Sequence, residues 1–200
     1  MADAKKSKKY LIMLTECAVM LALAVILSLI RIYKMPMGGS VTMFSMLPVC
    51  LIAIKYGPEQ GLEVAFLFML TKLGKALVEG DVFVYTVGFT AVLVCVLFDY
   101  VVPFTCLGLA GIFKKHGNAG ILGGVVAVIV LRFVCHFITG VVIWGQWAPE
   151  GMGKYLYSLL YNGQYMLPEL IITVVLAAVL INIPQMRKVL NLPARQSAQK

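Results

Sequence analysis

The residues that could carry chemistry are concentrated between Arg132 and Glu169, a stretch that holds both tryptophans, one histidine and four tyrosines. If the first part of this stretch is an α-helix, which turns about 100° per residue, several polar and aromatic side chains lie within about 80° of one another on one face. The residues of that face are Arg132, His136, Gly140, Ile143 and Trp147, with Trp144 at its margin. Rings beside a glycine can form a wall for a flat heteroaromatic ligand. The alternative, should the chain span a membrane, is an interfacial aromatic belt, which would not explain His136 or Asn162.

A carboxylate outside this stretch is a second candidate. Asp99 stands beside Tyr100 within an apolar run. A charge in hydrocarbon costs about 2.5 kcal/mol or more, so it usually faces a cavity or a partner. Two interpretations stay open: an ion pair with Arg132 or Lys72 that only ties segments together, or a carboxylate that binds a cation with help from neighbouring rings.

The other carboxylates and thiols of the apolar segments are expected to be structural. Glu169 follows Pro168, which suits a packing or capping role, and Glu16 suits a structural ion pair. The five cysteines are scattered without a C-x-x-C pair, so we expect buried thiols rather than a disulfide framework or a metal site.

The chain lacks the motifs that would make it an autonomous enzyme or pump. It has no GxxxxGK[ST] phosphate loop, no HExxH and no GxSxG, and its two histidines, His116 and His136, do not suggest a metal site. The two halves show no convincing similarity of the kind found in many secondary carriers. We therefore expect a protein that is not an enzyme, has no cofactor and takes its energy from elsewhere.

Composition fixes the class of protein. The 200 residues are 61% hydrophobic and 13% charged, with a mean hydropathy of +0.93, which excludes a soluble globule. The net charge of +8 comes from short basic clusters between apolar stretches, so it indicates membrane topology rather than nucleic-acid binding. The sequence predicts an all-α, multi-pass membrane protein.

Six apolar segments are long enough to be membrane spans. They cover residues 10–30, 37–54, 60–79, 83–104, 119–146 and 156–182. Gly38, Gly39 and Pro48 predict that the second is short, tilted or broken at its start. Eleven Lys and Arg residues then lie on the side of the termini against four on the other, so both termini are predicted to be cytoplasmic. We expect a basic tail at 1–9, a six-helix domain at 10–183 and a second tail at 184–200.

Three stretches together resemble a known family, the thiamine-specific substrate-binding subunits (S-components) of energy-coupling factor (ECF) vitamin transporters. They are RFVCHFITGVVIWGQWAPEGMGKYLYSLLYNG from Arg132, FDYVVPFTCLGLAGIF from Phe98 and MPMGGSVTMFSMLP from Met35. The resemblance covers nearly the whole chain. It implies a six-helix S-component fold with cytoplasmic termini in the bacterial plasma membrane.

The resemblance also implies a ligand site for thiamine. The family's binding histidine, stacking tryptophan, tyrosine and asparagine correspond to His136, Trp144, Tyr157 and Asn162. Its Glu-Tyr pair corresponds to Asp99 and Tyr100, where the shorter Asp must reach about 1.5 Å farther. In a regular helix Tyr157 and Asn162 lie about 140° apart, so they share a ligand only over the start of the helix, or if that start is irregular.

The chain departs from the family at the mouth of the site. A further family tyrosine corresponds only loosely to Tyr85, because Phe89 takes the direct position. Where some relatives have an aromatic cap, this chain has glycines, so the candidates for closing the site are Tyr33, Trp147 or backbone atoms.

The resemblance implies partners as well: a transmembrane coupling subunit and two ATPase subunits. The family's alanine-rich docking helix corresponds to Ala18, Ala22 and Ala24, whose spacing also allows simple helix packing. Three alternatives remain. They are an S-component for another flat vitamin such as riboflavin or biotin, an ion-coupled carrier using Asp99, Glu169 and Arg132, and a membrane enzyme using Asp99 and His136.

Overall fold

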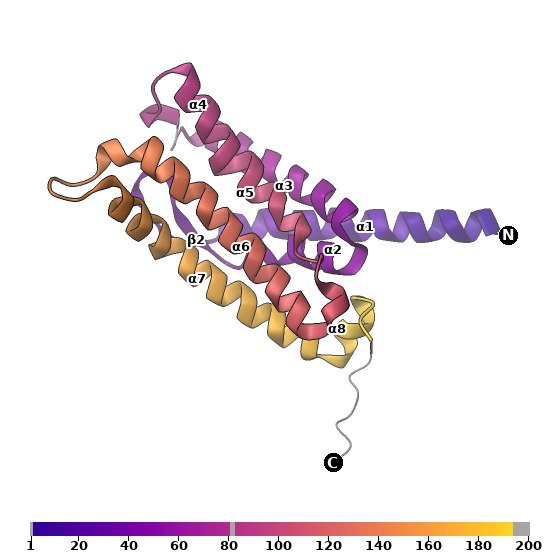
Figure 1. The fold of residues 1–200 in the computed structure, drawn as a ribbon. Helices are drawn as coiled ribbons and strands as arrows, with labels where there is room; N and C mark the ends of the chain where they lie inside the picture. The colour runs from indigo at the N-terminus through magenta and orange to yellow at the C-terminus, as the bar shows by residue number, and fades with distance from the viewer. Residues whose placement is uncertain (1, 81–82, 194–200) are drawn as a thin grey trace, which may run out of the picture.

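The computed structural model describes residues 2–80 and 83–193, which form an elongated helical bundle (Figure 1). Its long helices are α1 (Ala2–Leu29), α3 (Pro58–Glu79), α6 (Gly117–Val142) and α7 (Lys154–Asn182). Helix α2 (Leu47–Tyr56) is short, and α4 (Phe89–Cys95) continues through the π-helical segment η3 (Val96–Val101) into α5 (Val102–Thr105). Strands β1 (Arg31–Lys34) and β2 (Ser40–Thr42) pair antiparallel as a small hairpin. Helices α6 and α7 pack side by side, and the N-terminal part of α1 extends beyond the bundle.

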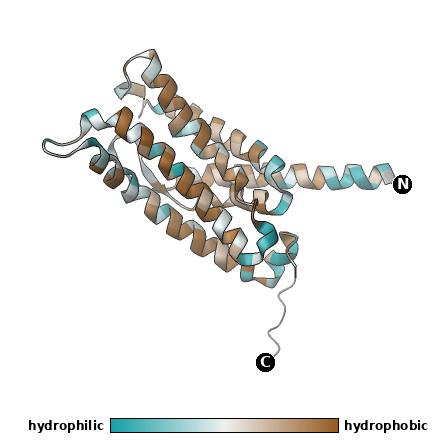
Figure 2. Ribbon diagram, in the orientation of Figure 1, coloured by the Kyte–Doolittle hydropathy of each residue, from teal (hydrophilic) through white to brown (hydrophobic). Residues whose placement is uncertain are grey.

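Four helical stretches are long and apolar enough to cross a membrane: Asp3–Leu29, Phe89–Leu109, Lys114–Val142 and Lys154–Asn182. Figure 2 shows apolar residues along the middle of the long helices and hydrophilic residues mostly near the ends of the bundle. Helix α3 has 22 residues, but its Glu and Lys residues reduce its hydropathy, and α2 has only 10. The structure is therefore predominantly helical, with several helices able to cross a membrane, as the sequence predicts.

The predicted second span differs most from the structure. Residues 37–54 are not one helix, because the chain first forms a 3-10 turn and strand β2, and α2 begins only at Leu47. Gly38 has a φ of 103°, in the left-handed region that favours glycine, and Phe44 also has a positive φ. Pro48 then lies in the first turn of α2, where its missing N–H costs no hydrogen bond. The expected break is therefore a β-hairpin.

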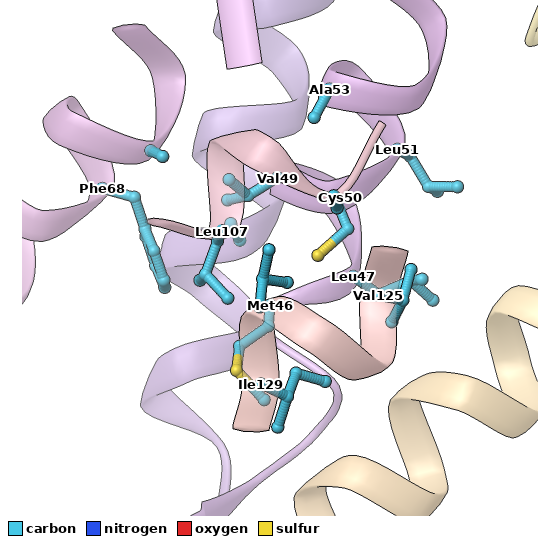
Figure 3. Close-up of a cluster of buried hydrophobic side chains, with 14 of the residues drawn as sticks. Met46, Leu47, Val49, Cys50, Leu51, Ala53, Phe68, Leu107, Val125 and Ile129 are labelled. Atoms are coloured by element: carbon cyan, nitrogen blue, oxygen red, sulfur yellow. The ribbon is translucent and has the colours of Figure 1, made fainter. Parts of the chain in front are cut away.

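Helix α2 forms the centre of the hydrophobic core. Its residues from Leu47 to Ile54 are all buried, which explains a sequence that is apolar on every face. Met46, Val49 and Cys50 lie close to Phe68 of α3 and to Leu107 (Figure 3).

Glycines allow the surrounding elements to approach backbone to backbone. A Cβ on Gly108 would lie 2.4 Å from the carbonyl carbon of Gly61, and one on Gly111 would lie 2.1 Å from the carbonyl oxygen of Ala53. Helices α2 and α3 and the turns after α5 are therefore interlocked without intervening side chains.

Polar ties join the outer elements to this core. Glu16 of α1 accepts hydrogen bonds from Lys55 and from the Tyr56 hydroxyl, at 2.7 Å for the latter, which confirms its structural role. The described parts of the two segments predicted as tails contain helix. Residues 2–9 continue α1, and 184–193 include α8 (Pro184–Val189), where buried Arg187 donates to the carbonyl of Pro193 and to Asn118.

Candidate functional site

A cavity of about 130 Å³ lies beneath the β-hairpin, between α3, η3, α6 and α7. Its volume exceeds the space needed for one water about tenfold. Six of the residues predicted to bind the ligand line it: Asp99, Tyr100, His136, Trp144, Tyr157 and Asn162. Segments far apart in the sequence therefore meet at one half-open cavity, and Trp144 and Tyr157, which line it, are not simply part of an interfacial belt.

Asp99 is the polar centre of the cavity. Its carboxylate accepts hydrogen bonds from His136 Nδ1 at 2.9 Å, from Trp144 Nε1 at 3.3 Å and from the Thr139 hydroxyl. The π-helical turn of η3 carries it, and such turns often occur at functional sites. The sequence did not single out Thr139, although it lies one turn beyond Cys135 on the face next to His136.

His136 connects Asp99 to Arg132. Its Nε2 lies 3.3 Å from Arg132 Nε, which can only donate, so Nε2 is the acceptor and Nδ1 carries the proton given to Asp99. The imidazole is thus neutral in this arrangement. Asp99 and Arg132 are linked through the ring and do not form the direct ion pair considered from the sequence.

Asn162 fixes the contact between α6 and α7. Its amide nitrogen donates to the carbonyl of His136 at 3.1 Å and to that of Ser158 at 3.0 Å, and its oxygen accepts from Tyr165 at 2.7 Å. Gly140 belongs to the same contact, because a Cβ there would lie 2.0 Å from the Ser158 hydroxyl oxygen. The glycine was expected to leave room for a ligand. It also makes room for α7.

Helix α7 is regular over its first turns, so Tyr157 and Asn162 do not need an irregularity near Gly163 to reach the same cavity. Tyr157 and Asn162 both line the cavity because it lies over the start of α7, the first of the two possibilities considered.

Backbone atoms of the hairpin cover the cavity. Tyr161 donates its hydroxyl hydrogen to the carbonyl of Pro36 and accepts from the Gly39 N–H at 3.3 Å. A Cβ on Gly39 would lie 2.9 Å from the ring of Tyr165. Of the candidates for closing the site, the backbone takes this place, whereas Tyr33 is exposed.

Tyr85 and Trp147 lie outside the cavity lining. Their rings pack edge to face with centroids 5.8 Å apart, and Trp147 is 46% exposed. The two residues predicted as ligand contacts are therefore not among the lining residues.

The opposite wall, from α3 and β1, is basic and was not predicted as part of the site. Lys72, Lys75, Ala76 and Glu79 line the cavity with Arg31. Glu79 lies 2.7 Å from both Arg31 and Lys75. The signal was present in the sequence, because residues at i, i+3, i+4 and i+7 share one helix face, but the sequence does not show that this face borders a cavity.

The predicted docking alanines are divided between surface and core. Ala18 and Ala22 are exposed on α1, whereas Ala24 is 0% exposed and packs in the core. Glu169 also has a structural role, as expected: it accepts hydrogen bonds from the backbone and the hydroxyl of Thr42 and so ties β2 to α7.

Comparisons with known proteins agree on one family. The family model described as thiamine transporter protein (Thia_YuaJ) matches residues 14–188. The thiamine transporter ThiT of Bacillus subtilis (strain 168) is 34% identical over 195 residues, which cover 90% of this chain and 96% of that protein. ThiT of Lacticaseibacillus paracasei is 26% identical, covering 89% of this chain and 91% of its own length. A solved structure of ThiT from Listeria monocytogenes has the same fold, with a TM-score of 0.71 at 24% identity over 92% of this chain and all of that one.

Proposed function

Since this chain belongs to the thiamine transporter family, we propose that it is the thiamine-binding subunit of an ECF-type importer. The family makes it a multi-pass cell-membrane protein and a transport component rather than an enzyme. The proposal adds the site where the ligand binds, the direction of transport and the partner subunits. Thiamine is bound at the cavity from the outer side, and separate subunits supply the energy that moves it inward.

The observation that carries the proposal is the group formed by Asp99, His136 and Trp144 at one end of the cavity. Thiamine has a permanently cationic thiazolium and a flat aminopyrimidine, which suit a carboxylate among rings. A carboxylate offers about four acceptor positions. Asp99 Oδ2 accepts the Trp144 hydrogen bond at 3.3 Å, and with about four acceptor positions the carboxylate has capacity for an amino group of the ligand as well.

The rings of the site serve orientation. Trp144 stacks on the ligand, Tyr100 and Tyr157 bound it from two sides, and Asn162 acts mainly by fixing α6 against α7. Thiamine is the transported ligand, and no cofactor is proposed.

The proposed topology has six spans with both termini cytoplasmic. Each predicted span contains at least one helix, and α8 and the start of α1 lie at the end of the bundle opposite the loop between α6 and α7 (Figure 1). The cavity lies at the loop end, next to the hairpin. A ligand from outside would therefore reach it at the hairpin, without crossing the rest of the bundle.

The proposed partners are the transmembrane coupling subunit and two ATPase subunits. The chain has no nucleotide-binding phosphate loop. Ala18 and Ala22 present small side chains on the exposed surface of α1, where another helix can approach closely.

Tryptophan fluorescence tests the site, because the chain has two tryptophans in different settings. In Trp147→Phe, thiamine should still quench the remaining emission, and in Trp144→Phe it should not. Thiamine, riboflavin and biotin are titrated in parallel into the detergent-purified protein. Quenching by riboflavin or biotin alone, or equal quenching in both variants, would contradict the proposal.

A further inference from the structure

The cavity wall has more positive than negative charge. Among the described lining residues, the cations are Arg31, Lys72, Lys75 and Arg132, and the carboxylates are Glu79 and Asp99. The hydrogen bonds of His136 make its ring neutral. A cationic ligand would increase the excess further.

Both carboxylates already have partners within the protein. Glu79 binds Arg31 and Lys75, each at 2.7 Å. Asp99 faces His136, Thr139 and Trp144 and reaches Arg132 only through the imidazole. Among the described lining residues, Lys72 and Arg132 are therefore the two cations that contact no carboxylate directly.

Lys72 and Arg132 lie at the same aromatic ring. Lys72 Nζ is 5.7 Å and Arg132 Cζ is 4.4 Å from the ring centroid of Phe104. Within residues 2–80 and 83–193, neither cation contacts a carboxylate, and one terminal nitrogen of Arg132 faces only the sulfur of Met46, a weak acceptor, at 2.8 Å.

Arg132 is 9% exposed, and Lys72 is half-buried. Buried charges are normally paired, and a ring quadrupole offsets only part of the cost of desolvation. Two such cations beside one ring, both open to a cavity, are the expected surroundings of an anion.

We propose that Lys72 and Arg132 form an anion subsite in the wall of the cavity. It takes a small anion, halide or phosphate, either free in solution or carried as a phosphate ester on the ligand. The anion balances the cavity charge and so favours the thiazolium cation beside it. The subsite rests on the charges of the cavity alone, and only its effect on thiamine affinity rests on the proposed function.

The first test omits thiamine. Thermal unfolding of the detergent-purified chain is measured in sodium gluconate, chloride and phosphate at equal ionic strength. Chloride or phosphate should raise the midpoint by about 2–4 °C over gluconate. Lys72→Met should lose this rise, Lys72→Arg should keep it, and Lys115→Met, which removes an exposed charge, should also keep it. Lys72→Gln replaces the Met variant if that variant lacks a cooperative transition.

An equal rise in Lys72→Met and Lys115→Met, or no rise in the unmodified chain, would overturn the subsite. The second test measures affinity for thiamine and for thiamine monophosphate by calorimetry. If the anion is free, thiamine should bind about tenfold tighter in chloride or phosphate than in gluconate. If it is the ester, the monophosphate should bind about tenfold tighter than thiamine in gluconate.

Lys72→Met should abolish the tighter binding, whether it comes from the free anion or from the phosphate ester. The same anion dependence and the same ratio of the two affinities in the variant would overturn the proposal. Loss of thiamine binding together with an intact Lys72-dependent rise in the unfolding midpoint would instead contradict the proposed function and leave the subsite supported.

Discussion

The imidazole of His136 lies between a carboxylate and a guanidinium group, with Nδ1 2.9 Å from Asp99 and Nε2 3.3 Å from Arg132. The ring thereby fixes the orientation of α6 against the π-helical turn that carries Asp99. Binding to such a prearranged group loses little side-chain entropy.

Asp99→Asn should reduce thiamine affinity about ten- to a hundredfold, because a charge-assisted hydrogen bond contributes about 1.5–3 kcal/mol. The amide has nearly the same shape but no charge to offer the thiazolium. Calorimetric titration measures the affinity. Glu150→Gln, which removes an exposed carboxylate, is the control and should bind as the unmodified chain does. Equal affinity in Asp99→Asn would contradict the role of the carboxylate.

Gly39→Ala should destabilise the closed hairpin, since its Cβ would lie 2.9 Å from the Tyr165 ring. Its φ of −59° suits alanine, so the effect is steric and should cost about 1–3 kcal/mol. Thermal unfolding and thiamine affinity are both expected to decrease. Gly153→Ala is the matched control, because its φ is −67° and its Cβ would meet no atom within 4 Å. A similar effect in both variants would exclude the contact as the cause.

Tyr161→Phe should accelerate thiamine dissociation about fivefold, because it removes the hydroxyl that binds Pro36 and Gly39, and such hydrogen bonds contribute about 1 kcal/mol. Stopped-flow tryptophan fluorescence measures the rate. Tyr155→Phe, at an exposed position, should leave it unchanged. An unaltered rate in Tyr161→Phe would show that the hydroxyl does not hold the hairpin during binding.

Ala18→Trp should spare thiamine binding and impair uptake by the complete transporter, because a large side chain would hold the coupling subunit away from α1. Val175→Trp places the same side chain on an exposed position of α7 and should preserve both activities. The measurements are ligand retention by the purified chain and uptake into cells or liposomes with all subunits. Uptake that Ala18→Trp leaves intact would place the docking surface elsewhere.

The part of the site on α6 could be predicted because that helix is regular. Helical spacing places His136, Gly140 and Arg132 on one face, and the structure keeps them there. Asp99 could be recognised from the sequence as a charge in an apolar run. Its hydrogen-bond partners could not be predicted, because the π-helical turn changes the direction in which its side chain points.

The hairpin and the basic wall were the features that the sequence did not predict. Three-residue and four-residue strands give too short an alternation to recognise within an apolar segment. Lys72 was considered as a partner of Asp99 and not as part of a cavity wall, because helical periodicity alone does not reveal which face of α3 borders a cavity. Tyr85 and Trp147 fit the expected composition of a site, but they pack against each other.

The glycine contacts around α2 limit how the protein can change shape. Where main chains touch at Gly61, Gly108 and Gly111, there is no layer of side chains that could slide or repack. We therefore expect that part of the molecule to move as a rigid body, so that any change in the shape of the cavity would come from separation along the α7 side.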